Sequence, residues 1–371
     1  MNLALSDEQE FLREAARGAL SRVKTVEAAR EALEGGTLPD LWPTAVEAGW
    51  PGLLVDEGHG GAGLSAFDAM LVAQECGRVL AGVPLLGLLP ASGLLQAAGD
   101  EALEAVAAGE LRPAWLPLRP PGDLVEGWTV DPRMGKRRAP APRATVDGDR
   151  VSFTGEVAWV PDAPGGDLLV VVGTDEDGAP VAGAVDASAA KIEALTRYDA
   201  TRSLGHVTLE GATGRRLAVT GAQLARAWYL AQALLGAESL GAVETALEMA
   251  VRYAKERFTF GRAIGSYQAI KHGLTEVLRR QENARSLLYY AGWAFDDRPE
   301  EFALAASAAR SAAGSALDFA SRQNIVTHGG IGATWEHDAP LFFRRAQLCR
   351  RLLGGAGDAT DRVAGELLAQ A

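Results

Sequence analysis

Arg257, Gln268 and His272 flank a glycine-containing segment that reads RFTFGRAIGSYQAIKH over residues 257–272. A guanidinium, a carboxamide and an imidazole beside an exposed turn can receive a pyrophosphate and an adenine, because all three supply hydrogen-bond donors. The spacing predicts that Gln268 and His272 lie one turn apart on the same face of a helix. Spacing alone fits equally well an ordinary helix–turn–helix with polar surface residues.

Two glycines in this segment indicate where the surrounding helices stop. Gly261 and Gly265 would each cost a helix roughly 1 kcal/mol. A long helical pattern precedes them, so we expect one helix to end near Phe258, a short turn, and a second helix from about Ser266. Arg257 would then lie at a helix end, next to the turn.

The pattern R-x-x-F-G-x-x-I-x-x-x-Q-x-x-x-H in this segment resembles the flavin-binding signature of the acyl-CoA dehydrogenase family. Two more segments are similar to that family: VTHGGIGATWEHD at 326–338, with its Gly-Gly-x-Gly turn, and residues 42–68, which contain GGAGLS. Their order and spacing match over nearly the whole chain. The resemblance implies FAD as cofactor. The residues that it assigns to FAD are Arg257, Thr259, Phe260, Gln268, Gly329 and Gly330.

In that family a carboxylate removes the α-proton of an acyl-CoA thioester, and the β-hydrogen leaves as hydride to the flavin, which gives a 2,3-enoyl-CoA. Such a base needs a dry slot whose burial raises its pKa. The chain has Leu353 at the family's glutamate position, and the alternative position falls in LAQALL at 230–235, again without a carboxylate. Both usual base positions therefore look empty. Asp358 is either a displaced base or the N-cap of a helix from Ala359 to Leu368.

The middle of the chain also departs from the family. Segment 115–123, WLPLRPPGD, lacks the Thr-Glu-Pro…Gly-Ser-Asp stretch that bonds the flavin ring in relatives, and Val326 stands where they carry a glutamine. Trp159 is either the counterpart of a family tryptophan that lies against the flavin or a core residue. What remains is the set of residues that the family extends across a subunit interface to a partner's cofactor.

The resemblance therefore implies a subunit that lacks the base. We expect it to belong to a heteromeric acyl-CoA dehydrogenase similar to those of actinobacterial steroid side-chain degradation. A homologous partner subunit would supply the base in a heterotetramer, and an electron-transfer flavoprotein would accept the electrons. Two alternatives stay open. One is a self-sufficient homotetramer whose base is Asp358, and the other is a flavin-free acyl-CoA-binding homologue.

A second polar cluster, Glu336-His337-Asp338, has acids on both sides of a histidine. Successive residues point in different directions, and no second ligand pair stands at metal spacing, so we expect no metal site. Capping and salt bridges near the last helix are the favoured roles.

Composition sets the broad class. The chain has 371 residues, 48% of them hydrophobic and 6% aromatic, with a net charge of −12. This acidity argues against a nucleic-acid partner. Cys76 and Cys349 form neither a disulfide framework nor a zinc motif. No long apolar run or signal peptide is recognisable, so we expect no membrane span and a cytoplasmic location.

The pattern of apolar residues along the sequence changes twice. Helical spacing, opened by a capping box at Ser6 and Gln9, runs to about residue 110. Prolines and short Val- and Leu-rich runs then predict strands. Long alanine-rich helical patterns return from about Ala222, with a final helix from about Pro340. We therefore expect a mainly α, α+β protein: an N-terminal helical domain (1–111), a middle β-barrel domain (112–220) and a C-terminal four-helix bundle (221–371).

Overall fold

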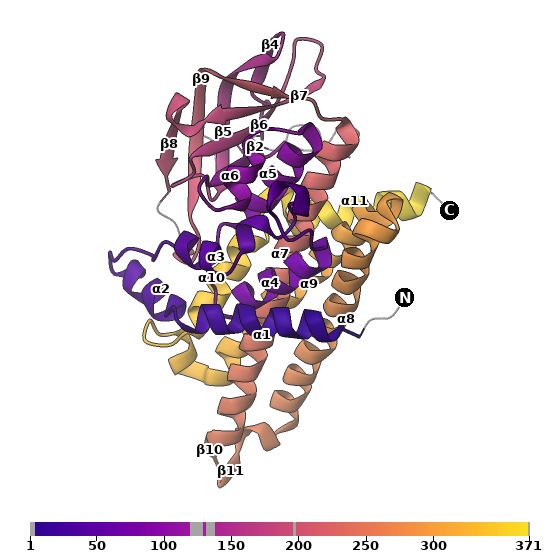
Figure 1. The fold of residues 1–371 in the computed structure, drawn as a ribbon. Coiled ribbons are helices and arrows are strands. Elements are labelled where there is room, and N and C mark those ends of the chain that lie inside the picture. Colours follow the sequence, from indigo (N-terminus) through magenta and orange to yellow (C-terminus); the bar gives the residue numbers. More distant parts are fainter. Residues whose placement is uncertain (1–3, 119–128, 131–137, 196–197, 370–371) are drawn as a thin grey trace.

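The computed structural model describes residues 4–118, 129–130, 138–195 and 198–369. Helices from both ends of the chain pack together, and a β barrel lies at one end of them (Figure 1). The predicted order of helical, β and helical parts is confirmed. Within the described ranges no helix is both long and apolar enough to cross a bilayer.

The N-terminal part consists of short helices. Its first helix begins as predicted, because Ser6 Oγ accepts from the backbone N–H of Gln9 at 3.2 Å and the Gln9 side chain accepts from Ser6 N–H. The helices are α1 (Asp7–Ser21), α2 (Thr25–Leu33), α3 (Trp42–Glu47), α4 (Ala66–Arg78), α5 (Leu85–Ala98) and α6 (Leu103–Ala107), with the 3-10 turns η1 (Trp50–Gly52) and η2 (Glu57–His59).

The middle part is a barrel that five strands close. The strands β6, β4, β5, β9 and β7 pair in that order, and a β6–β7 pairing completes the ring. The strands are β1 (Pro113–Leu116), β4 (Arg143–Asp147), β5 (Arg150–Pro161), β6 (Leu168–Thr174), β7 (Pro180–Asp186), β8 (Ala190–Ala194) and β9 (Leu204–Leu217), besides a small separate pair, β2 (Thr129–Val130) and β3 (Arg138–Ala139). Phe153 fills the interior, where Gly173 and Gly183 leave room for its ring.

The C-terminal part is the expected bundle. Its helices are α7 (Gly221–Glu256), α8 (Gln268–Asp297), α9 (Pro299–His328), α10 (Ala339–Cys349) and α11 (Gly355–Ala369). α7 runs through the centre of the molecule and packs on α4, α8 and α9 (Figure 1). The predicted break between α7 and α8 is right to within two residues at each side.

Glycines let α4 and α7 approach closely. A Cβ on Gly241 would lie 1.9 Å from the Gln74 carbonyl oxygen, and one on Gly77 would lie 2.0 Å from that of Glu238. We expect Gly241→Ala to lower the free energy of unfolding by about 1–3 kcal/mol, because the helices must separate. Gly93→Ala on α5 is the control, since a Cβ there meets nothing within 4 Å. It should stabilise by roughly 0.5–1 kcal/mol, and urea unfolding in which both variants shift alike would contradict the argument.

Asp162 joins the barrel to α5, and its buried carboxyl group should make the free energy of unfolding depend on pH. Its buried carboxylate accepts from Gly87 N–H at 2.9 Å, and burial raises its pKa to about 6, although Arg202 and this hydrogen bond act in the opposite direction. Since the folded pKa exceeds the unfolded one, the contribution to stability is complete below the ordinary value of 3.8 and is lost as the pH rises through 6.

We therefore expect the free energy of unfolding to fall by up to about 1.4 kcal/mol per pH unit between these limits, and Asp162→Asn to flatten that slope. Unfolding midpoints at pH 4, 5, 6 and 7 measure it. The exposed Asp147→Asn on β4 is the control and should keep the slope of the unmodified chain. Identical profiles for the two variants would exclude Asp162 as the cause.

Candidate functional site: a glycine hairpin at one end and a buried turn at the other

The segment predicted to be a simple turn is a small β-hairpin. β10 (Phe258–Thr259) pairs with β11 (Arg262–Ala263), and two residues connect them. Both connecting residues have positive φ, +49° at Phe260 and +77° at Gly261, which is the pattern of a type I′ turn. Tyr267 supports the hairpin, since its hydroxyl donates to the Thr259 carbonyl at 3.1 Å.

The Phe260 side chain is almost entirely free of packing within its own chain. Its side chain is 98% exposed, and its positive φ is unfavourable for a bulky residue. A strained, fully exposed aromatic residue usually serves contact with another molecule. The hairpin also forms the tip of the molecule farthest from the barrel (Figure 1). Phe260 is therefore placed to touch a ligand or a partner beyond its own chain.

The glycines predicted at 329–330 lie at the same end of the bundle. The ring of His328 packs 4.4 Å from that of Tyr253, which joins the end of α9 to the last turn of α7. Gly329 ends α9 with φ +65°, a conformation that favours glycine. Gly330 is exposed and a Cβ there would meet nothing within 4 Å, so its own chain does not require glycine.

Donors at this end fit the diphosphate half of a dinucleotide. The Arg257 side chain is exposed and has no hydrogen bond or ion pair with any described residue. Gln268 is the first residue of the 30-residue α8, whose N-cap residue Tyr267 provides no side-chain cap. An uncapped helix N-terminus presents free N–H groups and a positive dipole end to an anion. The structure brings these predicted residues to one end of the molecule and leaves them accessible.

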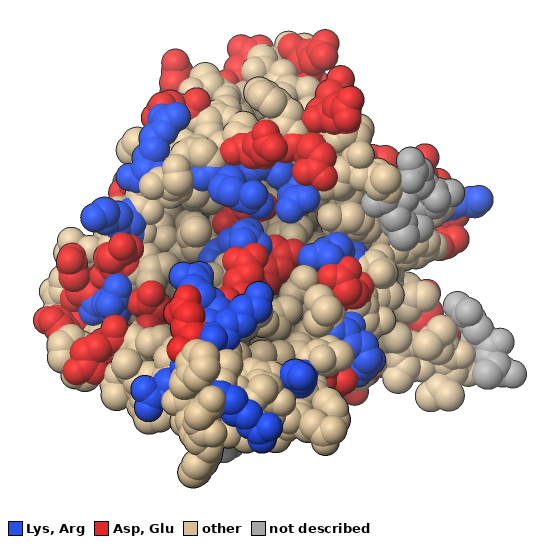
Figure 2. Space-filling view, turned by 90° about the horizontal axis from the view of Figure 1, so that it is seen from below, with Lys and Arg blue, Asp and Glu red and all other residues tan. Residues whose placement is uncertain are grey.

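Local charge also favours a phosphate ligand. Residues 252–272 contain five Lys or Arg side chains and one acid, in a chain whose net charge is −12. Figure 2 views the molecule from this end and shows Lys and Arg side chains over it, with acidic groups among them. This concentration of cations attracts an anion locally despite the overall acidity.

The predicted base positions lie elsewhere and lie together. Leu353 is buried, and its carbonyl accepts from the Gln232 side chain at 2.8 Å. The two positions at which the resemblance predicts a base are therefore in contact, and neither has an acidic residue. The cavity beside them measures about 20 Å³, far below the roughly 300–1,000 Å³ of small-molecule sites. In this conformation neither an acyl chain nor a flavin ring has space next to Leu353.

Asp358 lines the same small cavity. The prediction that it caps a helix is wrong, because α11 already begins at Gly355 and Asp358 lies in its first turn. The reason is local: Leu353, Gly354 and Gly355 all have positive φ, so the chain reverses before Asp358 is reached.

The two groups of residues cannot share one cofactor within a single chain. From Gln232 to Arg257, α7 rises roughly 37 Å at about 1.5 Å per residue. That exceeds the length of an extended flavin dinucleotide. Arg257 therefore cannot reach a flavin that lies beside Leu353 of its own chain.

The cluster around His337 forms local contacts of the predicted kind. Arg30 pairs with Asp338 at 3.1 Å, which agrees with a salt-bridge role. At the start of α10 the Ala339 N–H donates to His337 Nδ1, so the histidine and not a neighbouring acid caps this helix. Among the described residues there is no group of metal-ligating side chains.

Two predicted contacts of the flavin ring are not decided by the structure. Trp159 is half-buried at the end of β5 with φ +59°, and its ring meets that of His206 at 5.5 Å. Segment 115–123 lies only partly in the described ranges: β1 ends at Leu116, and residues 119–123 are outside them.

A buried charge network escaped the sequence analysis. Glu238 on α7 pairs with Arg202 and, at 3.6 Å, with Arg345, and Arg345 donates to Asp199 at 3.1 Å. All four side chains are at most 2% exposed. A single acid within the apolar run ALLGAESLGAV was the one signal in the sequence. The network fixes α10 and, with it, the approach to the turn at Leu353.

The fold is of a flavin-dehydrogenase type. It has a helical part, a barrel and a helical bundle in this order, with the buried turn at Leu353 near its end. The family models described as acyl-CoA dehydrogenase, N-terminal domain, and acyl-CoA dehydrogenase, C-terminal domain, match residues 6–117 and 221–366. The chain belongs to the acyl-CoA dehydrogenase family, which is FAD-dependent.

Relatives match over almost the whole chain. Acyl-CoA dehydrogenase IpdE2 of Mycolicibacterium smegmatis is 29% identical over 372 residues, which cover 98% of this chain and 100% of that protein. The structure of a Tcur3481-Tcur3483 steroid ACAD variant is 29% identical, covers 98% of both chains and gives a TM-score of 0.84. The ChsE4-ChsE5 complex from Mycobacterium tuberculosis gives the same TM-score at 24% identity over 99% of both chains, which shows the shared fold.

Proposed function

We propose that this chain is the base-less subunit of a heteromeric acyl-CoA dehydrogenase that forms 2,3-enoyl-CoA. The observation that supports the proposal most strongly is the distance between two groups of residues, the predicted FAD-binding residues and the predicted position of the base. The cofactor-type residues Arg257, Phe260 and Gln268 are exposed at one end. The family's base position, Leu353, is buried nearer the other end of α7, beside a cavity of about 20 Å³. A homologous partner subunit would contribute the flavin ring pocket and the carboxylate.

The residues of this chain would bind the diphosphate part of that shared cofactor, away from the flavin ring. Arg257 would pair with the diphosphate, and the N-terminus of α8 would offer its N–H groups. Gly330 would allow the close approach of a bound group. FAD, when bound, supplies hydride acceptance, and this chain supplies position and charge.

Further parts of the proposal are carried over from relatives. The Tcur3481-Tcur3483 steroid ACAD pairs two proteins in its name, which supports a heteromer and a steroid or fatty acyl-CoA substrate. An electron-transfer flavoprotein as electron acceptor and a cytoplasmic location belong to the same proposal.

One observation favours a second candidate. Asp358 lines the cavity that contains Leu353, so a homotetramer with Asp358 as the base is the alternative. For that enzyme to work, the cavity of about 20 Å³ must open to admit a thioester. A flavin-free acyl-CoA-binding homologue is the third candidate, and the free Arg257 at a cationic surface counts against it.

Expression of the chain alone and together with a homologous subunit tests these functions. Flavin absorbance that is present only in the co-expressed complex and bleaches with an acyl-CoA supports the heteromer. Yellow, bleachable protein from the chain alone supports the homotetramer and contradicts our proposal. Persistent absence of flavin from both preparations supports the flavin-free homologue.

A further inference from the structure

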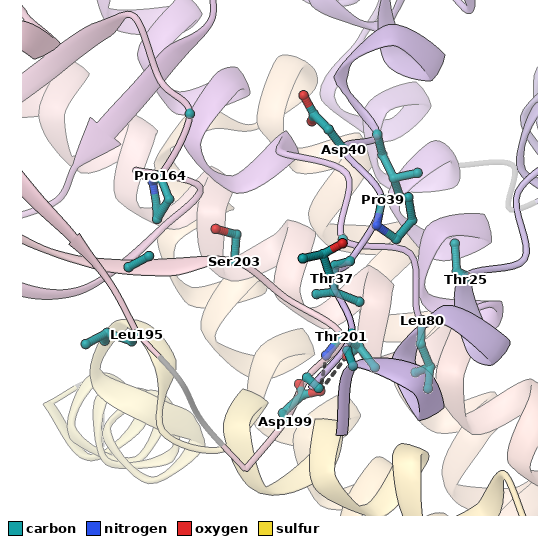
Figure 3. Close-up of a pocket in the computed structure, with 18 of the residues that line it drawn as sticks. Thr25, Thr37, Pro39, Asp40, Leu80, Pro164, Leu195, Asp199, Thr201 and Ser203 are labelled. Atoms are coloured by element: carbon teal, nitrogen blue, oxygen red, sulfur yellow. Dashed lines mark hydrogen bonds between the residues drawn. The ribbon is translucent and has the colours of Figure 1, made fainter. Parts of the chain in front are cut away.

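A cavity of about 610 Å³ lies between the N-terminal helices and the barrel (Figure 3). It shares no lining residue with the small cavity beside Leu353 or with the glycine hairpin. Segment 36–41, in the connection from α2 to α3, forms one side, and residues 194, 195, 199–201 and 203, at the end of β8 and before β9, form the other. Its volume is in the range of small-molecule sites, about 300–1,000 Å³.

The walls of this cavity combine apolar surface with free hydroxyls. Leucine and proline side chains supply most of the apolar contact: Leu38, Pro39, Leu80, Pro164 and Leu195. Thr37 and Ser203 lie on opposite sides of the opening (Figure 3). Neither hydroxyl has a hydrogen-bond partner among the described residues. Apolar walls with a few convergent polar groups are typical of sites for small organic molecules.

The charged groups in the walls are already neutralised. Asp40 pairs with Arg112 at 3.1 Å, and Asp199 pairs with Arg345 at 3.1 Å. No unpaired charge is therefore left in the described walls to balance an ionised ligand, and burying one without a partner is costly. This argues for a neutral ligand.

The two sides of the cavity differ in how firmly they are held; we call the side at Thr201 the floor and segment 37–40 the roof. Thr201 in the floor accepts from Arg345 at 2.6 Å and thereby belongs to the buried charge network. The roof is segment 37–40, whose backbone N–H groups at Thr37, Leu38 and Asp40 donate to no described residue. The ion pair of Asp40 with Arg112 and a bond from Trp42 N–H to Asp40 hold this strap. A fixed floor under a loosely held strap suits a pocket that closes over its ligand.

We propose that this cavity is a binding site for a neutral, largely apolar molecule that carries one or two carbonyl or hydroxyl oxygens. The apolar body would contact the leucine and proline walls, and the oxygens would meet the Ser203 and Thr37 hydroxyls. The site is separate from the flavin and acyl-CoA chemistry proposed above and does not depend on it.

Titration of the full chain with Nile red, a neutral apolar dye with a carbonyl group, tests the site. We expect saturable fluorescence enhancement with a blue shift. Ser203→Phe places a ring inside the cavity and should abolish the saturable phase. Ser203→Ala removes one hydroxyl and should weaken binding roughly 2- to 10-fold. Ser21→Phe, an exposed serine at the end of α1, is the matched control and should bind as the unmodified chain does.

The exposed hairpin is the competing location for such a dye. Phe260→Ser removes its most exposed aromatic ring and should leave the saturable phase unchanged. Loss of binding in Phe260→Ser, or equal binding by Ser203→Phe and Ser21→Phe, would overturn the assignment. If Ser203→Phe does not fold, as judged by circular dichroism, Ser203→Ala decides, and unchanged affinity in that variant overturns the proposal.

Discussion

Arg257→Ala will weaken flavin binding by the co-expressed complex roughly 10- to 100-fold. A charge-assisted hydrogen bond contributes about 1.5–3 kcal/mol, and each 1.4 kcal/mol is a tenfold change in affinity. The Arg257 side chain has no hydrogen bond or ion pair with any described residue, and the backbone bonds of Arg257 do not depend on the side chain, so the substitution should leave the fold of the chain intact. Flavin content after gel filtration, and titration of the apo complex with FAD, measure the effect.

Two further variants distinguish a specific contact of Arg257 with the diphosphate from a general effect of positive charge. Arg257→Lys keeps the charge and loses the planar fork, so its affinity should fall between those of Arg257→Ala and the unmodified complex. Arg279→Ala removes an exposed arginine of α8 that pairs with Glu276 at 2.7 Å, and it should retain flavin fully. Equal flavin retention by Arg257→Ala and Arg279→Ala would remove residues 257–272 from the cofactor site.

Glu238→Gln will destabilise the chain by about 3–5 kcal/mol. The substitution removes the carboxylate that pairs with Arg202 and, more distantly, with Arg345; Arg345 keeps Asp199, but the buried network is left with one uncompensated positive charge, which is costly. Because Arg345 belongs to α10, the loss should also loosen the turn at Leu353. Urea unfolding followed by circular dichroism measures the change.

Glu248→Gln is the matched control on the same helix. Glu248 is half-exposed and pairs with Arg78 at 2.8 Å, and such surface pairs contribute about 0–1 kcal/mol. Unfolding midpoints of the two variants that coincide would show that the buried network does not hold the bundle together.

The long helices were predictable because their signals are local. Apolar residues recur at helical spacing along α7, α8 and α9, and glycines mark where the first of these helices ends. The hairpin at Phe258–Ala263 was not predicted, since two-residue strands carry no alternating pattern. Its turn places Phe260 at positive φ, where glycine or asparagine is the usual signal.

The region around Leu353 was harder to predict because its contacts join distant segments. Leu353 and Gln232 are 121 residues apart in sequence, yet they share a hydrogen bond. The sequence revealed that both positions lack an acid, but not that they meet or that the cavity beside them is nearly filled. Asp358 was misplaced for a smaller reason, since three consecutive residues of positive φ moved the helix start to Gly355.

The apolar tip of the bundle has a consequence for how the protein must be made. Five apolar side chains at this tip are each more than half exposed in the isolated chain: Phe258 and Phe260 on the hairpin, Val326 in the last turn of α9, and Ile331 and Trp335 beyond it. Apolar surface of this kind invites aggregation and chaperone capture until a companion covers it. If the proposed partner subunit covers this tip, cells that produce the chain in excess of that partner should lose the surplus to proteolysis, so that matched synthesis of the two sets the amount of enzyme that accumulates.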